Sequence, residues 1–381
     1  MHRTRDCSLH HRFHLVTLAA VVTVFITADC SSSTEQEKNS DKDGGIDAST
    51  AEQNRGARIY ATMAATHKVI VIDERSQTII DSIAIGKGPA ILLSTPDQKK
   101  LYSANWEDFT VSSIDVEASA ASQITMPGRP YVIAMAPDGE HVYVGCASTP
   151  PEVSVIRTDT DTIDNHLEMS ELPASIIVSP DGEILYIAML HLSSDGPGTL
   201  QANSSTTGET VREPLTVGTS PAWITITPDG SKVYTLNFLS DDISVVDTES
   251  WTVEATIDTG SGSRGIIGAV TPDGSSLYVT NHGSGNFVEI DTATNRITKT
   301  IDVNGRPVGV CFNREGSRVY VTDLGPESLQ GAADLNYLLT GVFTLPGNGQ
   351  VSIFDTTSGE RIGSEIGVDP GATSVVVIEP G

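Results

Sequence analysis

Seven tyrosines recur at nearly even intervals along this 381-residue chain, and their spacing constrains the fold more than any other feature. Successive members are 42, 41, 43, 48, 44 and 42 residues apart, and each lies in a short β-branched run such as LYSAN, VYTLN or LYVTN. A repeat of about 40 residues built from short strands is typical of a β-propeller, in which each repeat forms one four-stranded blade. The seven are Tyr60, Tyr102, Tyr143, Tyr186, Tyr234, Tyr278 and Tyr320.

A turn precedes most of these tyrosine strands and predicts a tight connection between the first and second strands of each blade. Proline presets φ, aspartate hydrogen-bonds locally, and glycine accepts a positive φ. The third strands mostly end in aspartate, and we expect these carboxylates to cap turns rather than to bind a metal ion. The Pro-Asp-Gly copies of the turn begin at Pro137, Pro180, Pro228 and Pro272.

The two ends of the repeat region predict how the ring closes. The folded region begins at Arg58 with a second strand, whereas residues 372–381 (ATSVVVIEPG) match a first strand and its turn. We therefore expect residues 58–381 to form an all-β, seven-bladed propeller with four antiparallel strands per blade. The C-terminal strand is expected to join the three N-terminal strands, which removes exposed sheet edges.

Residues 1–29 predict an export signal. Three arginines precede the apolar run Leu15–Ile26, which is too short to span a bilayer but suits the core of a secretory signal peptide. Residues 30–57 are acidic and polar, with one large apolar side chain, Ile46. Such a segment cannot bury enough apolar surface to fold, and it predicts a disordered spacer.

A cysteine, Cys30, directly follows this signal and is itself followed by serines. The arrangement resembles the lipobox region of bacterial lipoproteins, although Asp29 stands where that pattern has a small residue. The resemblance implies that Cys30 becomes the lipidated first residue of an anchored protein at the cell envelope. Cleavage after Ala28, with release into the periplasm or outside the cell, is one alternative, and an uncleaved signal that tethers the protein is another.

The acidic composition argues against some classes of partner. The formal net charge is −26, from 23 basic and 49 acidic residues. This charge repels phosphate backbones and anionic headgroups, so we expect no nucleic-acid partner and no membrane contact beyond a lipid anchor. The sequence has no CxxCH or CxxC motif and predicts no cofactor and no metal site. Cys146 and Cys311 lie in well-separated repeats and predict free thiols, and we expect a monomer.

The segment LYVTNHGSGNFVEIDTATNRITKTIDVNGRPVGV, from Leu277 to Val310, resembles the YVTN β-propeller repeat of bacterial and archaeal surface proteins. The resemblance covers residues 58–381. Similar seven-bladed propellers occur in surface-layer proteins, in lactonases of the 6-phosphogluconolactonase type, and in the heavy subunit of methylamine dehydrogenase. We find no catalytic motif of these families that could be carried over to this chain.

The repeat register places candidate binding residues at one mouth of the central channel. There, the loops from fourth to first strands meet the loops from second to third strands. Grouped cationic side chains recognise carboxylate or phosphate, so the sequence predicts a basic funnel for a small anion. The alternative is that these are exposed turn residues that point outward. The residues of the first loop set are Lys87, Arg129, Arg264 and Arg306, together with Trp223.

The second loop set contributes His282 and Asp323, which lie on neighbouring blades. A histidine and an aspartate so placed are candidates for a general acid–base pair, and a solvated loop histidine is the alternative. Two loops, Met189–Gly198 and Gly325–Gly349, exceed the repeat length. Long insertions in a regular scaffold often carry function, so the second is expected to act as a lid or an interaction loop, or else to pack on the ring.

Together these features favour a non-enzymatic module at the cell envelope that binds a small anionic ligand or another protein. A lactonase-like hydrolase of the 6-phosphogluconolactonase type is one alternative, because a basic funnel would suit a sugar-acid lactone. A redox partner subunit similar to the amine dehydrogenase heavy chain is another. The repeat by itself does not distinguish among them, because a propeller carries many unrelated functions.

Overall fold

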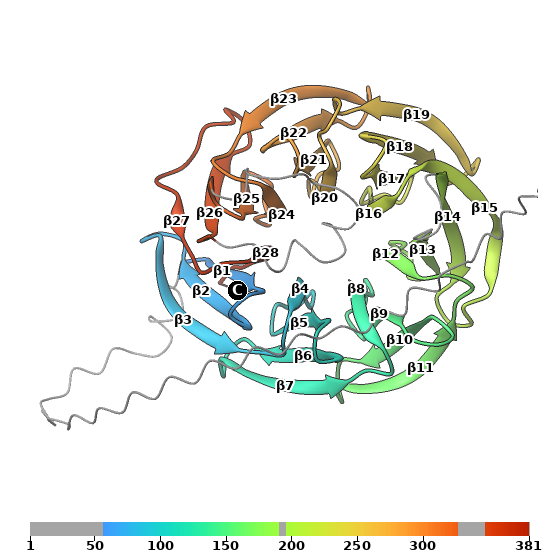
Figure 1. Cartoon of the computed structure of the whole chain (residues 1–381), viewed down its shortest axis with the longest axis horizontal. Helices are drawn as coiled ribbons and strands as arrows, with labels where there is room; N and C mark the ends of the chain where they lie inside the picture. The colour runs from blue at the N-terminus through green and yellow to red at the C-terminus, as the bar shows by residue number, and fades with distance from the viewer. Residues whose placement is uncertain (1–55, 190–195, 327–346, 381) are drawn as a thin grey trace, which may run out of the picture. The chain divides into compact units, whose positions relative to one another are not determined.

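The computed structural model describes residues 56–189, 196–326 and 347–380, and it shows a ring of seven four-stranded antiparallel blades (Figure 1). The predicted fold class is confirmed. None of the described segments forms a helix long and apolar enough to cross a membrane. The predicted export signal, Cys30, most of the spacer, and the central parts of both long loops lie outside the described residues.

Strand exchange between the two ends of the described chain closes the ring, as predicted. In the closing blade the order from the inside outward is β28 (Ala372–Ile378), β1 (Arg58–Met63), β2 (Lys68–Asp73) and β3 (Thr78–Ala84). The backbone N–H of Ser374 on β28 donates to Thr62 Oγ1 on β1 at 3.0 Å. Its hydroxyl oxygen accepts from the N–H of Leu92 in the next blade at 3.0 Å, so β28 joins both neighbours.

Blades 1 to 6 follow in chain order, each running from its inner to its outer strand. Blade 1 contains β4 (Pro89–Ser94), β5 (Lys100–Asn105), β6 (Thr110–Asp115) and β7 (Ala120–Thr125). Blade 2 contains β8 (Arg129–Met135), β9 (His141–Ala147), β10 (Glu152–Arg157) and β11 (Thr162–Glu168). Blade 3 contains β12 (Pro173–Val178), β13 (Ile184–Met189), β14 (Pro197–Ser204) and β15 (Thr210–Thr219).

The second half of the ring repeats the same order (Figure 1). Blade 4 contains β16 (Pro221–Ile226), β17 (Lys232–Asn237), β18 (Asp242–Asp247) and β19 (Thr252–Asp258). Blade 5 contains β20 (Gly265–Val270), β21 (Ser276–Asn281), β22 (Asn286–Asp291) and β23 (Arg296–Asp302). Blade 6 contains β24 (Pro307–Phe312), β25 (Arg318–Asp323), β26 (Gln350–Asp355) and the short β27 (Ile366–Gly367).

The Pro-Asp-Gly turns join the first two strands of their blades, and those of Gly139, Gly230 and Gly274 also approach the turn of the preceding blade. Gly139 has a φ of 77°, a value that glycine adopts without strain. A Cβ atom at Gly139 would lie 2.9 Å from Cδ of Pro96, in the corresponding turn of blade 1. The turn glycine is therefore required both by its backbone conformation and by the close approach of two blades.

The aspartates that end the third strands cap the following turns, as the sequence predicts. The carboxylate of Asp73 accepts hydrogen bonds from the N–H and the hydroxyl of Ser76, each at 2.7 Å. These hydrogen bonds hold the pKa of Asp73 below its ordinary value. The same backbone contact recurs at Asp115, Asp247, Asp291 and Asp355.

The seven repeat tyrosines are buried where neighbouring blades meet, with exposed fractions of 0 to 6%. In blade 1, the hydroxyl of Tyr102 donates to Asp161 of blade 2 at 2.5 Å, and Lys100 donates to the same carboxylate at 2.9 Å. In blade 6, Tyr320 and Arg318 both donate to Glu74 of the closing blade. A tyrosine and a cation two residues before it thus join one blade to the next.

We expect Asp161→Asn to lower the free energy of unfolding by about 1–3 kcal/mol. The amide keeps the shape of the side chain and tolerates the positive φ of this residue, 54°. It loses the charge that strengthens the bonds from Tyr102 and Lys100. Denaturant unfolding at neutral pH measures the change. Asp159→Asn is the control, because its exposed pair with Arg157 contributes little. Equal losses in the two variants would contradict this role.

Candidate binding site at the channel mouth

The two loop sets predicted to form the channel mouth lie side by side at one end of the blades. In each case the loop that enters a blade is bonded to the loop between the second and third strands of that blade. Repeated backbone hydrogen bonds of 2.9 to 3.2 Å hold this arrangement. They run from Trp106 to Gly88, from Phe238 to Ser220, from His282 to Arg264, and from Leu324 to Arg306.

Three arginines occupy the same position of the repeat, and each lies near a ring of the preceding blade. The guanidinium carbon of Arg129 is 5.2 Å from the ring centroid of Trp106, and that of Arg264 is 5.7 Å from the ring centroid of Phe238. Arg306 is close enough to His282 for its positive charge to lower the pKa of that imidazole. The repeat therefore places a cation over an aromatic ring at two junctions of the mouth and beside a histidine at a third.

The three arginines differ in what their guanidinium groups contact. Arg264 donates to the carbonyl of Leu239 at 2.9 Å and pairs with Asp241 at 3.3 Å, so it holds a loop together. Arg306 is buried, with 4% of its surface exposed. Arg129 is half-buried and makes no hydrogen bond or ion pair with any described residue. Of these three side chains, that of Arg129 is the one whose guanidinium group has neither a hydrogen bond nor an ion pair with the described residues.

Lys87 lies one residue before the repeat position of the arginines, in the loop that enters blade 1. Its side chain is exposed and takes part in no ion pair with the described residues. Its backbone N–H donates to the carboxylate of Asp108 at 2.8 Å, and its carbonyl accepts from the N–H of Glu107 at 3.2 Å. The loop is thus fixed by its backbone, and the ammonium group remains in solvent.

Trp223 joins two blades on the inner side of the ring. Its indole N–H donates to the carbonyl of Gly268 at 2.8 Å, which ties β16 to β20. The ring also packs against apolar side chains of blades 4, 5 and 6. The packing between propeller blades therefore accounts for a large aromatic side chain at this position.

His282 and Asp323 are each held by the backbone rather than by one another. His282 is fully buried, and its Nδ1 lies 3.0 Å from the carbonyl of Pro307, to which it donates as a neutral imidazole. Burial lowers the pKa of His282 to about 3. Asp323 is 1% exposed, accepts from the N–H of Gly325 at 2.7 Å, and has its pKa raised by burial to about 7.

Asp323 stands where other blades have a buried asparagine. It is the third residue after the repeat tyrosine, the position that Asn105, Asn237 and Asn281 occupy in blades 1, 4 and 5. The Asn105 amide donates to Ser112 at 2.8 Å, a neutral contact suited to a dry site. A carboxyl group in the same place avoids an unpaired buried charge by holding its proton, which accounts for its raised pKa.

Two residues of the mouth were missed by the sequence reasoning, Phe109 and Tyr131. The Phe109 ring centroid is 5.1 Å from the guanidinium carbon of Arg129, and Tyr131 packs with Trp106 at a centroid distance of 6.3 Å. Both lie within three residues of Trp106 or Arg129, so the repeat register could have found them. We call Lys87, Trp106, Phe109, Arg129 and Tyr131 the blade 1–2 corner.

Comparison of sequences finds one partial relative and no family model that matches the chain. Antigen Lp49 of Leptospira interrogans is 30% identical over 129 residues, which covers 29% of this chain and 28% of the antigen. The match spans less than a third of the length of either protein. The resemblance to the YVTN repeat therefore remains a prediction from the sequence.

Comparison of structures finds many propellers of similar architecture. A periplasmic gluconolactonase of Pseudomonas aeruginosa has a TM-score of 0.64 at 17% identity, covering 85% of this chain and 99% of that one. Hydrazine synthase of Kuenenia stuttgartiensis has a TM-score of 0.61 at 19% identity, covering 69% of this chain and 88% of that one. At these identities the likeness shows the shared seven-bladed fold alone.

We expect Asp323→Asn to stabilise the protein increasingly between pH 4 and pH 7. The unfolded carboxyl has a pKa of about 3.9. The folded one has a pKa of about 7. Between those values the folded state alone holds the proton, so the stability of the wild type falls as the pH rises. Denaturant unfolding of both proteins from pH 4 to pH 8 measures the difference.

His282 acts in the opposite direction, because its lowered pKa makes the fold less stable as the pH falls from 6.5 toward 3. This effect is common to wild type and Asp323→Asn and cancels in their difference. A difference that stayed constant over the whole pH range would show that Asp323 is ionised in the folded protein.

Proposed function

We propose that this protein is a binding module that holds a small anion, such as a carboxylate, at the blade 1–2 corner of its channel mouth. The single observation that carries the proposal is the environment of Arg129. Its guanidinium carbon lies 5.2 Å from the ring centroid of Trp106 and 5.1 Å from that of Phe109, and the group has no carboxylate partner among the described residues. A guanidinium group offers five N–H donors, and carboxylate is the ligand that its fork fits best.

The two aromatic rings prepare Arg129 for such a ligand. Trp106 and Phe109 both contact the guanidinium, and these contacts limit the rotamers that the side chain adopts. An arginine that is ordered before binding loses less side-chain entropy when the ligand arrives. The N–H groups of the guanidinium make no hydrogen bond with the described residues. They remain available for a bidentate bond to a carboxylate.

Lys87 supports the same choice of ligand by its charge. It follows the outer strand of the closing blade, next to the loop of Trp106, and its ammonium group has no acidic partner among the described residues. Asp108, the nearest bonded carboxylate, accepts from the Lys87 N–H and from the Thr110 hydroxyl, which occupies both of its oxygens. Two cations at one corner contrast with the net charge of −26 and favour an anion there.

Lactone hydrolysis is a second candidate, and the fold of the gluconolactonase of Pseudomonas aeruginosa motivates it. A sugar-acid product would present a carboxylate to Arg129 and Lys87, so the corner suits this candidate as well. The predicted acid–base residues weigh against it. His282 is buried and neutral, and Asp323 is bonded to Gly325. Release of acid from glucono-δ-lactone above the spontaneous rate would favour hydrolysis over binding alone.

Gluconate is a suitable first probe of the corner, together with acetate and citrate. We expect the wild type to bind at least one of the three in isothermal titration. Arg129→Met should then weaken binding by about tenfold or more, because a bond between two charged groups contributes roughly 1.5–3 kcal/mol. Lys87→Met should weaken binding less, because an exposed charge is screened by solvent and salt.

Arg157→Met is the matched control, because Arg157 is an exposed arginine at the opposite end of its blade. It should bind the probe as the wild type does. Equal affinity of Arg129→Met and wild type, or no binding of any of the three acids, would remove the proposal.

We further propose that the module is exported and anchored to a membrane of the cell envelope through lipidated Cys30. The basic start, the apolar run Leu15–Ile26 and the cysteine that follows support this location. A polar spacer after Cys30 would keep the propeller away from the lipid surface. The partial likeness to a protein named as an antigen is consistent with exposure outside the cytoplasm.

Cys30→Ala tests the anchor in the full-length protein expressed in a bacterial host. The wild type should incorporate a fatty-acid label and partition into the detergent phase, and the variant should lose both properties. Cys7→Ser is the control, because Cys7 precedes the apolar run and would be removed with the signal. An unlabelled wild type, or a labelled Cys30→Ala variant, would contradict lipidation at this residue.

A further inference from the structure

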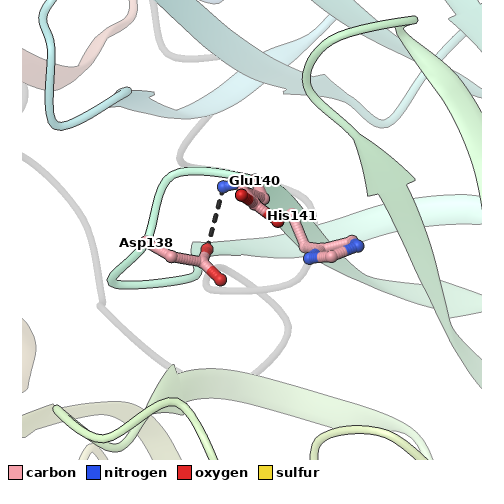
Figure 2. A group of neighbouring side chains, drawn as sticks. All are labelled: Asp138, Glu140 and His141. Atoms are coloured by element: carbon pink, nitrogen blue, oxygen red, sulfur yellow. Dashed lines mark hydrogen bonds between the residues drawn. The ribbon is translucent and has the colours of Figure 1, made fainter.

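We propose that the Pro-Asp-Gly turn of blade 2 binds a divalent transition-metal ion of the zinc type. Asp138, Glu140 and His141 bring one ligand atom each to within 4.8 Å of the others (Figure 2). The turn joins β8 to β9, so it lies at the opposite end of the blade from the mouth. The site is therefore separate from the blade 1–2 corner.

His141 differs from the lysines and the arginine at the same repeat position of three other blades, because it does not join two blades. In the repeat register it occupies the position of Lys100, Lys232 and Arg318, each of which donates to a group of the next blade. The imidazole of His141 makes no hydrogen bond or ion pair with the described residues, although it is half-buried. A nitrogen ligand is thus left without a structural partner next to two carboxylates.

The carboxylates are oriented by the turn that holds them. One oxygen of Asp138 accepts from the N–H of Glu140 at 2.8 Å, which fixes the side chain and leaves its second oxygen for a metal (Figure 2). Both Asp138 and Glu140 are exposed. In a tetrahedral zinc site, neighbouring ligand atoms are about 3.4 Å apart. Small rotations of the two exposed side chains are enough to close the remaining gap.

A cavity of about 400 Å³ adjoins these residues and adds negative charge. Its one cation, Arg157, donates two hydrogen bonds to Asp159, which neutralises it. Asp138, Glu140 and Asp164 remain as a surplus of negative charge that favours a cation. The cavity is lined by Glu140, His141, Arg157, Thr158, Asp159 and Asp164.

The mixed ligand set selects the class of metal. Calcium and magnesium prefer sites made wholly of oxygen, whereas an imidazole nitrogen with carboxylates suits zinc and its neighbours. Three protein ligands leave one tetrahedral position for water or for a donor atom of a further ligand. The cavity beside the site gives such a ligand room.

Blade 3 provides a natural comparison because its turn has nearly the same sequence. Pro180-Asp181-Gly182-Glu183 repeats Pro137-Asp138-Gly139-Glu140, but Ile184 follows where blade 2 has His141. The proposal therefore predicts no site in blade 3 of the wild type. It also predicts that the single substitution Ile184→His would create a zinc site in blade 3.

Titration of the full-length protein with Zn²⁺, monitored by isothermal titration calorimetry, tests the site. Because histidine and cysteine side chains elsewhere in a chain are also potential zinc ligands, the readout is the difference between variants. We expect His141→Ala, Asp138→Asn and Glu140→Gln each to lose one equivalent of Zn²⁺ or to bind it at least tenfold more weakly. Ile184→His should gain one equivalent, and Asp181→Asn should behave as the wild type does.

The substituted residues lie in the exposed turns or, for His141 and Ile184, at the half-buried first position of the following strand. Unchanged circular dichroism and thermal midpoints would confirm that each variant is folded. Unchanged Zn²⁺ stoichiometry and affinity in His141→Ala would overturn the proposal. Loss of zinc in His141→Ala alone, with both carboxylate variants unaffected, would also overturn the three-ligand site.

Discussion

The contact between neighbouring blades is the constraint on which the rest of this structure depends, and buried tyrosines supply much of it. A buried phenol needs a hydrogen-bond partner, and in blades 1 and 6 that partner is a carboxylate of the next blade. The hydroxyl groups of Tyr60 and Tyr234 have none among the described residues. At those junctions the rings pack with apolar side chains of both blades, which is a contact that every junction shares.

Because the contacts between neighbouring blades are so regular, the residues that depart from this pattern can be recognised. His141 stands where three other blades have a lysine or arginine that donates to the next blade, and its imidazole makes no such bond to the described residues. Asp323 replaces a buried asparagine and must keep its proton to remain in place. Arg129 shares its position with Arg264 and Arg306 but lacks their internal partners. Each departure leaves a chemical group that the fold itself does not require.

The fold could be predicted from the sequence because each repeat of about 40 residues forms one blade. Even spacing of the tyrosines, the turn chemistry and the unpaired last strand together determine seven blades and their closure. The same register placed Arg129, Arg264 and Arg306 around one mouth. It could not distinguish them, because Asp241, which pairs with Arg264, lies in a loop of the preceding blade rather than beside the arginine in the chain.

The sequence by itself determined the number of blades, their order and the end of each blade at which a given loop lies. These properties follow from strand length and alternation, which are local and repeat with the chain. Only the tertiary structure decided which polar side chains are available for chemistry. Burial and partner choice arise where two blades meet, from residues far apart in the chain: Lys100 and Asp161 are 61 positions apart, and Arg318 and Glu74 are 244 apart. A repeat can set the positions of such residues, but the neighbouring blade decides whether their charges are already satisfied.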